Sequence, residues 1–280
     1  MSIAMPGAPA GRWTRRPVPL ASALFAAAVC FASIPATRAA EAMSAAGEVP
    51  AAAAPTLGAH TLLGQEDGYG ANPAVTAPID TQASGSSFLV FNAGHASNTD
   101  PPTDNKGNAW SPLGAPVVYH GYDGAYDLKA YTALGGHGGA GHVVSIVKNG
   151  NSSGELTLPF IEVRNAAVIA DSAEVYADAA PQVSSGSVTT TGPAVLVALW
   201  WGDGFYLQQT AVPDNGFTVA DEFLDLPPNS AVQCVVAYRQ VAAAGTWRVS
   251  WTQAPAQGAI LWLIALQAQG GDGIFANGFE

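Results

Sequence analysis

Short stretches of β-branched and aromatic residues, bounded by turn residues, fill the chain from about residue 81 to residue 268. No window shows the sustained 3.6-residue apolar spacing that an amphipathic helix needs. The sequence therefore predicts an all-β fold, an antiparallel two-sheet β-sandwich of jelly-roll type. Eleven strands are expected, at residues 86–93, 117–120, 127–133, 142–149, 155–163, 187–191, 194–201, 217–226, 231–241, 246–252 and 259–268.

Turn residues and side-chain alternation support this prediction. Asn149-Gly150 and Asp214-Asn215-Gly216 separate strand-like stretches, which is typical of β-hairpins. Residues 194–201 and 259–266 are apolar at nearly every position, so we expect them to be central strands covered on both faces. Alternation in residues 232–239 turns Cys234 toward the core.

The N-terminus has the layout of a secretory signal peptide. Three arginines, Arg12, Arg15 and Arg16, precede a continuous apolar run from Leu20 to Ile34, and Pro35 and small residues follow. A membrane-spanning helix needs roughly 20 apolar residues, and this run is shorter. We therefore expect export to the cell surface or the extracellular space, with no transmembrane anchor after cleavage.

Composition divides the chain and limits its partners. Residues 1–39 are the expected signal peptide, 40–80 a disordered Ala/Pro-rich linker and entry segment, 81–268 the sandwich and 269–280 a tail. Cleavage would remove four of ten basic residues, leaving six against 21 acidic residues, a net charge of −15. Nucleic-acid binding requires a basic surface and is not expected. Cys234 would be the single cysteine, which excludes an intramolecular disulfide.

No recognised catalytic or cofactor motif occurs in the sequence. There is no Gly-x-Ser-x-Gly elbow and no dinucleotide fingerprint. Glu155 and Glu162 are seven residues apart, so on one strand they would face opposite sides of the sheet. His137 and His142 flank a glycine-rich run that we interpret as a hairpin loop with exposed imidazoles, because no cysteine pair or carboxylate accompanies them at zinc-site spacing. We expect no catalytic residue, metal or cofactor.

The strongest binding candidate follows a predicted central strand. Trp201, Asp203 and Tyr206 lie together there, and Trp110 lies in another turn region. An exposed aromatic ring can pack on the C–H face of a sugar while a carboxylate accepts hydrogen bonds from its hydroxyls. The alternative is that these aromatic residues pack in the core, which is their commonest use.

Several segments resemble a β-sandwich module found in uncharacterised secreted or surface proteins of bacteria. They are Thr103–Trp110 (TDNKGNAW), the strand around Tyr131, Glu155–Val163, Thr189–Gly204 and Ala211–Val219. The resemblance covers roughly residues 81–268 and implies a fold but no activity. The last eight residues, Gly273–Glu280 (GIFANGFE), resemble a short tail on secreted proteins of some Gram-negative bacteria.

Three functions remain open from the sequence. The first is a secreted, non-catalytic β-sandwich protein that binds a glycan or a surface partner. The second is a secreted glycan-active hydrolase without a recognisable motif, which would need convergent polar groups in a concave pocket. The third is a structural protein of the envelope or matrix, which would associate with itself.

Overall fold

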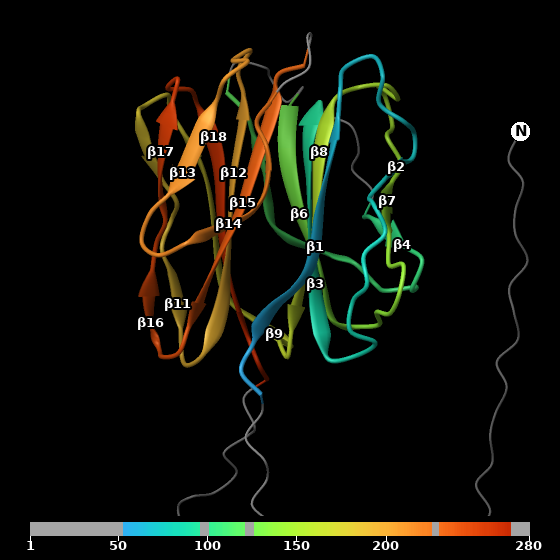
Figure 1. The fold of residues 1–280 in the computed structure, drawn as a ribbon, viewed down its shortest axis with the longest axis vertical. Coiled ribbons are helices and arrows are strands. Elements are labelled where there is room, and N and C mark those ends of the chain that lie inside the picture. The colour runs from blue at the N-terminus through green and yellow to red at the C-terminus, as the bar shows by residue number, and fades with distance from the viewer. Residues whose placement is uncertain (1–52, 96–100, 121–125, 226–229, 270–280) are drawn as a thin grey trace, which may run out of the picture. The chain divides into compact units, whose positions relative to one another are not determined.

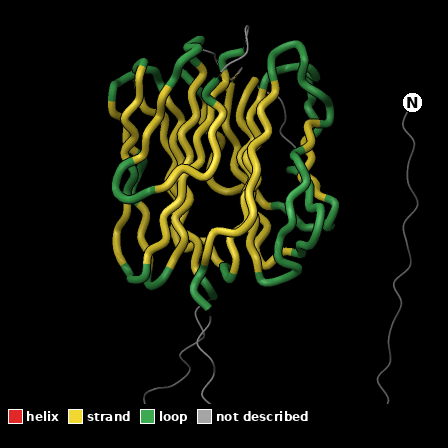
Figure 2. Tube along the Cα trace, in the orientation of Figure 1, coloured by secondary structure: helices red, strands yellow, loops and turns green. Residues whose placement is uncertain are grey.

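The computed structural model describes residues 53–95, 101–120, 126–225 and 230–269. All regular secondary structure in these residues is β-strand (Figure 2). The predicted all-β class is therefore confirmed. The expected signal peptide, residues 40–52 of the expected linker and residues 270–280 of the tail lie outside the described residues.

The first half of the fold, residues 56–164, forms one five-stranded and one three-stranded antiparallel sheet (Figure 1). The strand order is β1-β8-β3-β6-β5 in the large sheet and β2-β7-β4 in the small one. The bounds are β1 Thr56–Gln65, β2 Ala74–Val75, β3 Ser86–His95, β4 Thr103–Asp104, β5 Ser111–Val118, β6 Tyr126–Gly136, β7 Val144–Ile146 and β8 Leu156–Arg164.

The second half, residues 168–267, forms a second five-stranded sheet of order β14-β15-β12-β18-β9. It also has a three-stranded sheet, β10-β17-β13, and the pair β11-β16. The bounds are β9 Val168–Ala177, β10 Gln182–Ser184, β11 Val188–Thr190, β12 Ala194–Asp203, β13 Thr210–Pro213, β14 Thr218–Phe223, β15 Val232–Val241, β16 Gly245–Trp247, β17 Ser250–Ala254 and β18 Ala259–Gln267.

The two halves have the same nested pairing. The first strand of each half pairs with the last, as β1 with β8 and β9 with β18. Inside these lie β2 with β7 and β10 with β17, and then β3 with β6 and β12 with β15. The pair β11-β16 corresponds to an isolated bridge between Ile79 and His142. Such a rolled-up hairpin is a jelly roll, so the predicted topology occurs twice in the chain.

Local features also recur at equivalent places in the two halves. The tight turn after β4 contains Gly107 and the turn after β13 contains Gly216, with φ of 75° and 74°. Both need glycine because other residues rarely adopt this left-handed conformation. Val-Ser followed by a large apolar residue occurs in both three-stranded sheets, ending at Ile146 in β7 and at Trp251 in β17.

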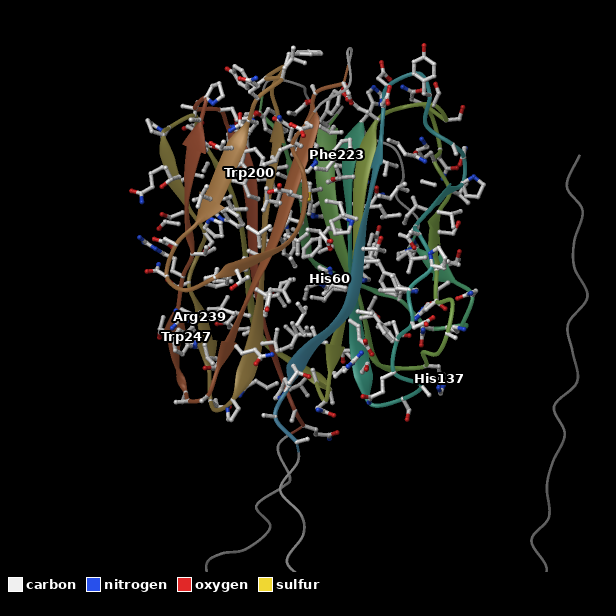
Figure 3. All side chains as sticks on the ribbon, in the orientation of Figure 1. His60, His137, Trp200, Phe223, Arg239 and Trp247 are labelled. Atoms are coloured by element: carbon white, nitrogen blue, oxygen red, sulfur yellow. The ribbon has the colours of Figure 1, made fainter. Side chains whose placement is uncertain are left out.

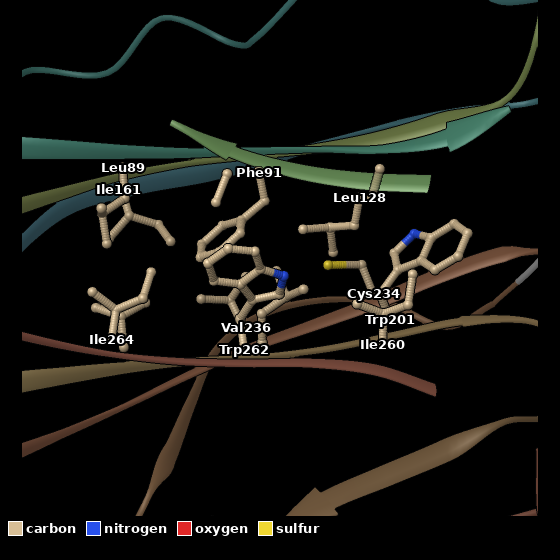
Figure 4. Packing of buried hydrophobic residues seen from close by; sticks show 14 of the residues in the cluster. Leu89, Phe91, Leu128, Ile161, Trp201, Cys234, Val236, Ile260, Trp262 and Ile264 are labelled. Carbon is tan, nitrogen blue, oxygen red and sulfur yellow. The ribbon is translucent and has the colours of Figure 1, made fainter. Parts of the chain in front are cut away.

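The two large sheets pack face to face through the inner core (Figure 4). Leu89, Phe91 and Leu128 of the first half meet Cys234 and Trp262 of the second half there. Phe91 and Trp262 are in edge contact, with ring centroids 6.2 Å apart. Cys234 is fully buried, as its alternation predicted.

The smaller sheets cover the outer faces of both large sheets. Trp200 and Trp251 fill the outer core of the second half, and Phe88 and Phe160 fill that of the first half. Every residue of β12 and β18 is buried, and both strands are interior in their sheet. This confirms that residues 194–201 and 259–266 are central strands. It also adds outer β-layers to the expected two-sheet arrangement.

Two long strands differ from the sequence-based expectation. β1 begins at Thr56, inside the segment expected to be a linker, and β9 was not predicted at all. Both are edge strands whose positions are mostly half-buried, so neither shows a clear alternation of apolar and polar residues. β9 also contains Asp171 and Glu174, residue types that are depleted in strands.

Candidate functional site

Two of the four predicted binding residues lie in the interior. Trp201 is fully buried in the inner core, where its ring meets Tyr119 at a centroid distance of 5.6 Å. Trp110 is buried in the outer core of the first half, against Phe160, and its Nε1 donates to Asp104. Neither ring can present its face to a sugar at the surface.

Asp203 was predicted to accept hydrogen bonds from a ligand at the surface. It is instead buried. Asp203 is the last residue of β12, and neither of its carboxyl oxygens has a hydrogen-bond partner. Burial, together with the nearby carboxylate of Glu155, raises the pKa of Asp203 to about 7. A carboxyl group without donors in an apolar setting favours its neutral form, so this side chain holds a proton at slightly acid pH.

Glu155 is the well-satisfied partner in this buried acidic pair. Its Oε2 accepts hydrogen bonds from the hydroxyl of Ser230 at 2.6 Å and from the amide of Ala231 at 2.7 Å. Its Oε1 accepts from the hydroxyl of Tyr126 at 3.2 Å. Burial and the two carboxylates raise the pKa of Tyr126. Glu155 therefore joins strand ends from both halves by hydrogen bonds, and both carboxylates are shielded from solvent.

Tyr206, the fourth predicted residue, lies in an exposed apolar loop between β12 and β13. It is 36% exposed, and its neighbours Phe205 and Leu207 are 73% and 66% exposed. Trp110 lies in the first half and Trp201 and Asp203 in the interior, so the structure does not assemble the four predicted residues at one surface. The sequence did place Tyr206 in the part of the loop that solvent reaches.

A groove of about 390 Å³ lies beside this loop, between β13 and β14. Both are edge strands, of the small sheet and of the large sheet of the second half (Figure 1). We call this the second-half groove. Its lining combines carboxylate, amide and hydroxyl groups with apolar side chains, and it comprises Gln209, Thr210, Ala211, Val212, Val219, Glu222, Phe223, Leu224 and Asp225.

Buried glutamines hold the loop against this groove. Gln257 donates from Nε2 to the side-chain oxygens of Gln209 at 2.9 Å and Gln233 at 2.8 Å. Gln233 in turn donates from Nε2 to the backbone oxygens of Tyr206 at 3.0 Å and Leu224 at 3.1 Å. These bonds tie the loop to the end of β14. Sequence reasoning missed them, although glutamines among apolar strand residues are a signal of buried polar contacts.

Phe223 lines the groove, and its ring also accounts for the need for glycine at position 64 of the opposite sheet. A Cβ atom on Gly64 of β1 would lie 2.4 Å from the Phe223 ring, so the ring occupies the space over that glycine. Figure 3 shows Phe223 at the side of β14 that faces β1, with Trp200 on the other side of the same large sheet. The ring therefore belongs both to the groove and to the contact between the halves.

The first half has a smaller groove beside its corresponding edge strands. It measures about 240 Å³ and follows β5 and the segment before β4. We call it the first-half groove. Its lining is largely apolar and rich in proline, comprising Pro101, Pro112, Leu113, Gly114, Pro116, Lys129, Ala130 and Tyr131. Proline cannot donate a backbone hydrogen bond, so this edge offers few partners to a polar ligand.

The histidines do not gather into a metal centre in the described part of the chain. No group of three or more His, Cys, Asp or Glu side chains there has a metal-binding arrangement. His137 is exposed (Figure 3). His142 is fully buried, which corrects its expected exposure, because it bonds to Thr81 and packs edge-on against Phe88. Burial lowers the pKa of His142, which keeps the ring neutral.

Comparison with known proteins gave no relative from which to transfer a function. No family model, no curated protein and no solved structure matches the chain. The described residues contain no helix long and apolar enough to cross a membrane.

Proposed function

We propose that this protein is exported and acts outside the cytoplasm as a non-catalytic binding protein that takes a glycan in the second-half groove. The observation that carries the proposal is the groove itself. It is open, it lies between two edge strands, and it combines Glu222, Asp225 and Thr210 with the apolar side chains of Val212 and Val219.

Sugar recognition needs both kinds of surface. Hydroxyl groups require acceptors and donors, and the C–H faces of a pyranose ring require apolar or aromatic contact. Phe205 and Tyr206 are exposed on the loop that leads into the groove lining at Gln209, and a buried hydrogen bond from Gln233 holds the backbone of this loop in place. A site held in place before binding loses less entropy when it takes up its ligand.

The hydrolase alternative finds less support. General acid–base work requires carboxyl groups within reach of a substrate. Asp203, Glu155 and Glu162 are all buried, and Glu162 accepts hydrogen bonds from Ser86 and from two backbone amides. A hydrolase acting in the groove would therefore depend on Glu222 and Asp225, the two exposed acidic residues of its lining. The structural-protein alternative predicts that the protein associates with itself. Sedimentation velocity of the parent protein tests this alternative.

A glycan array probed with the mature protein tests the binding proposal. Val212→Ala and Val219→Ala each shorten an exposed apolar side chain that lines the groove, and we expect each to weaken binding about three- to fivefold. Tyr69→Ala is the matched control, because Tyr69 is 81% exposed and does not line the groove. Equal loss in the control, or no glycan bound by the parent protein, would contradict the proposal.

Export has its own test. Charge reversal of Arg12, Arg15 and Arg16 spoils the basic region of the expected signal peptide and should retain the protein in the cytoplasm. N-terminal sequencing of the exported form should begin between Ala40 and Met43. Unchanged export of the variant would refute this part of the proposal.

A further inference from the structure

The charges in the second-half groove are of one sign. Glu222 and Asp225 are exposed carboxylate residues of its lining, and the lining contains no Lys, Arg or His. The neighbouring acidic residue, Asp221, does not line the groove and instead pairs with His60 at 2.7 Å. The negative charge in the groove is therefore not neutralised by a basic lining residue.

The basic residue closest in sequence to the groove lining, Arg239, makes its contacts elsewhere. Arg239 donates to the backbone oxygen of Asn215 and lies over the ring of Trp247, with its Cζ 4.9 Å from the ring centroid. Figure 3 labels Arg239 and Trp247 together, well below Phe223 on the second half. An anionic polysaccharide entering the groove would meet two carboxylates without a compensating cation, and like charges disfavour such a complex.

We propose that the second-half groove selects a glycan that carries free amino groups, such as a polymer of 2-amino-2-deoxyglucose. This inference rests on the proposed glycan-binding function and names the chemical class of its ligand. The ammonium groups lie at the carboxylates of Glu222 and Asp225, and the C–H faces of the sugar rings pack on Val212 and Val219. Thr210 supplies a hydroxyl partner on the same wall.

The groove also suits this ligand in shape. It runs between two edge strands, which present unpaired backbone groups on their free sides. An extended chain of sugars can lie along such a slot and bond to these groups, whereas a single ammonium ion would use only the carboxylates. Acetylation of the amine removes its positive charge, so the acetylated polymer is the natural comparison ligand.

The test compares three hexamers by isothermal titration with the mature protein. These are hexa-glucosamine, hexa-N-acetylglucosamine and hexalysine. We expect hexa-glucosamine to bind at least about tenfold more tightly than the acetylated hexamer. Glu222→Gln and Asp225→Asn should each reduce this affinity about three- to fivefold, the size expected for one exposed ion pair. Higher salt should weaken binding to the parent protein and have little effect on the double variant.

Asp178→Asn is the matched control for lost negative charge. The Asp178 side chain is 95% exposed and lies outside the groove, so its removal should leave the affinity for hexa-glucosamine unchanged. All three replacements are at exposed positions, and an unchanged melting temperature checks that each variant is folded.

The outcomes separate this inference from the function on which it rests. Equal binding of the acetylated hexamer, weakened in Val212→Ala, overturns the amino-sugar inference and leaves glycan binding in the groove in place. Hexalysine bound as tightly as hexa-glucosamine through Glu222 and Asp225 overturns it in favour of general attraction of cations. If no hexamer binds and the glycan array is also negative, both proposals fail.

Discussion

The two halves of the chain share one strand order but differ at the edges that this order leaves free. In the first half, edge strand β5 contains Pro112 and Pro116 beside a small apolar groove. In the second half, edge strand β14 has no proline and places Glu222 on a larger, polar groove. The shared frame sets where a groove can form. The side chains on the edge decide whether it is blocked against partners or open to a polar ligand.

The greatest loss of stability should follow the removal of a large side chain from either outer core, and comparing the two losses tests whether the halves are packed alike. Ile146 and Trp251 are fully buried at corresponding positions in the small outer sheets of the two halves. Trp251→Ala should lower the free energy of unfolding by about 3–5 kcal/mol and Ile146→Ala by about 2–4 kcal/mol, because each leaves a cavity. Denaturant titration measures both. A loss below about 1 kcal/mol at either site would show that the two outer cores are not comparable.

The next effect concerns the buried acid between the halves. The folded pKa of Asp203 is raised to about 7 from 3.8, so the folded state binds this proton more tightly than the unfolded state. The stabilisation of the folded state by this bound proton is fully present below about pH 4 and is lost as the pH rises through 7. Such a shift is worth roughly 4 kcal/mol, and Asp203→Asn should therefore be the more stable protein at pH 8.

The difference between Asp203→Asn and the parent protein is the quantity to follow, because other carboxylates titrate in both proteins. Denaturant titrations at pH 5, 6, 7 and 8 should show a gain in the variant that grows with pH and levels off above 7. A difference that stays constant over this range would mean that Asp203 is ionised throughout.

A smaller effect is expected where the halves meet at their edges. His60 of β1 and Asp221 of β14 form a contact of 2.7 Å between Nδ1 and Oδ2. The hydrogen bond to Asp221 raises the pKa of His60, so this stabilisation is fully present below pH 6.5 and is lost as the pH rises through the folded pKa. His60→Asn should cost about 0.5–1 kcal/mol at pH 5.5, since the pair is partly exposed, and less at pH 9. An equal cost at both pH values would refute the charged pair.

The weakest change is expected in self-association through β5, the proline-containing edge strand of the first half. Pro112→Thr together with Pro116→Thr restores two backbone N–H groups to edge strand β5. We expect partial dimerisation at high protein concentration, because unpaired strand edges pair with one another. Sedimentation velocity measures it. The parent protein should remain monomeric, and self-association of the parent would favour the structural-protein alternative.

Local patterns predicted much of the fold. The continuous apolar runs around Trp200 and Trp262 identified the two central strands, and alternation placed Cys234 in the core. These local patterns could not predict that the two halves share one strand order. That order is set by pairings such as β1 with β8, whose partners are about 100 residues apart in sequence. The edge strand β9 was missed because half-burial gives no clear period.

The site was less predictable than the fold. Trp201 and Trp110 were predicted to bind a ligand, but both are buried, because the sequence does not show which face of a strand is covered by a further sheet. The second-half groove depends on how two edge strands stand side by side and on contacts from Gln233 to the loop. Such contacts join residues that are distant in sequence and leave no local pattern.

Hydrogen exchange of the mature protein with and without hexa-glucosamine locates the bound ligand on one half of the molecule or the other. If the ligand lies in the second-half groove, protection should increase in residues 204–225 and remain unchanged in residues 101–118 of the first half. The amides of β13 and β14 should contribute most, because both strands line the groove and each pairs with a neighbouring strand on one side only. Protection centred on residues 101–118, or no change in either segment, would contradict the assignment of binding to the second half.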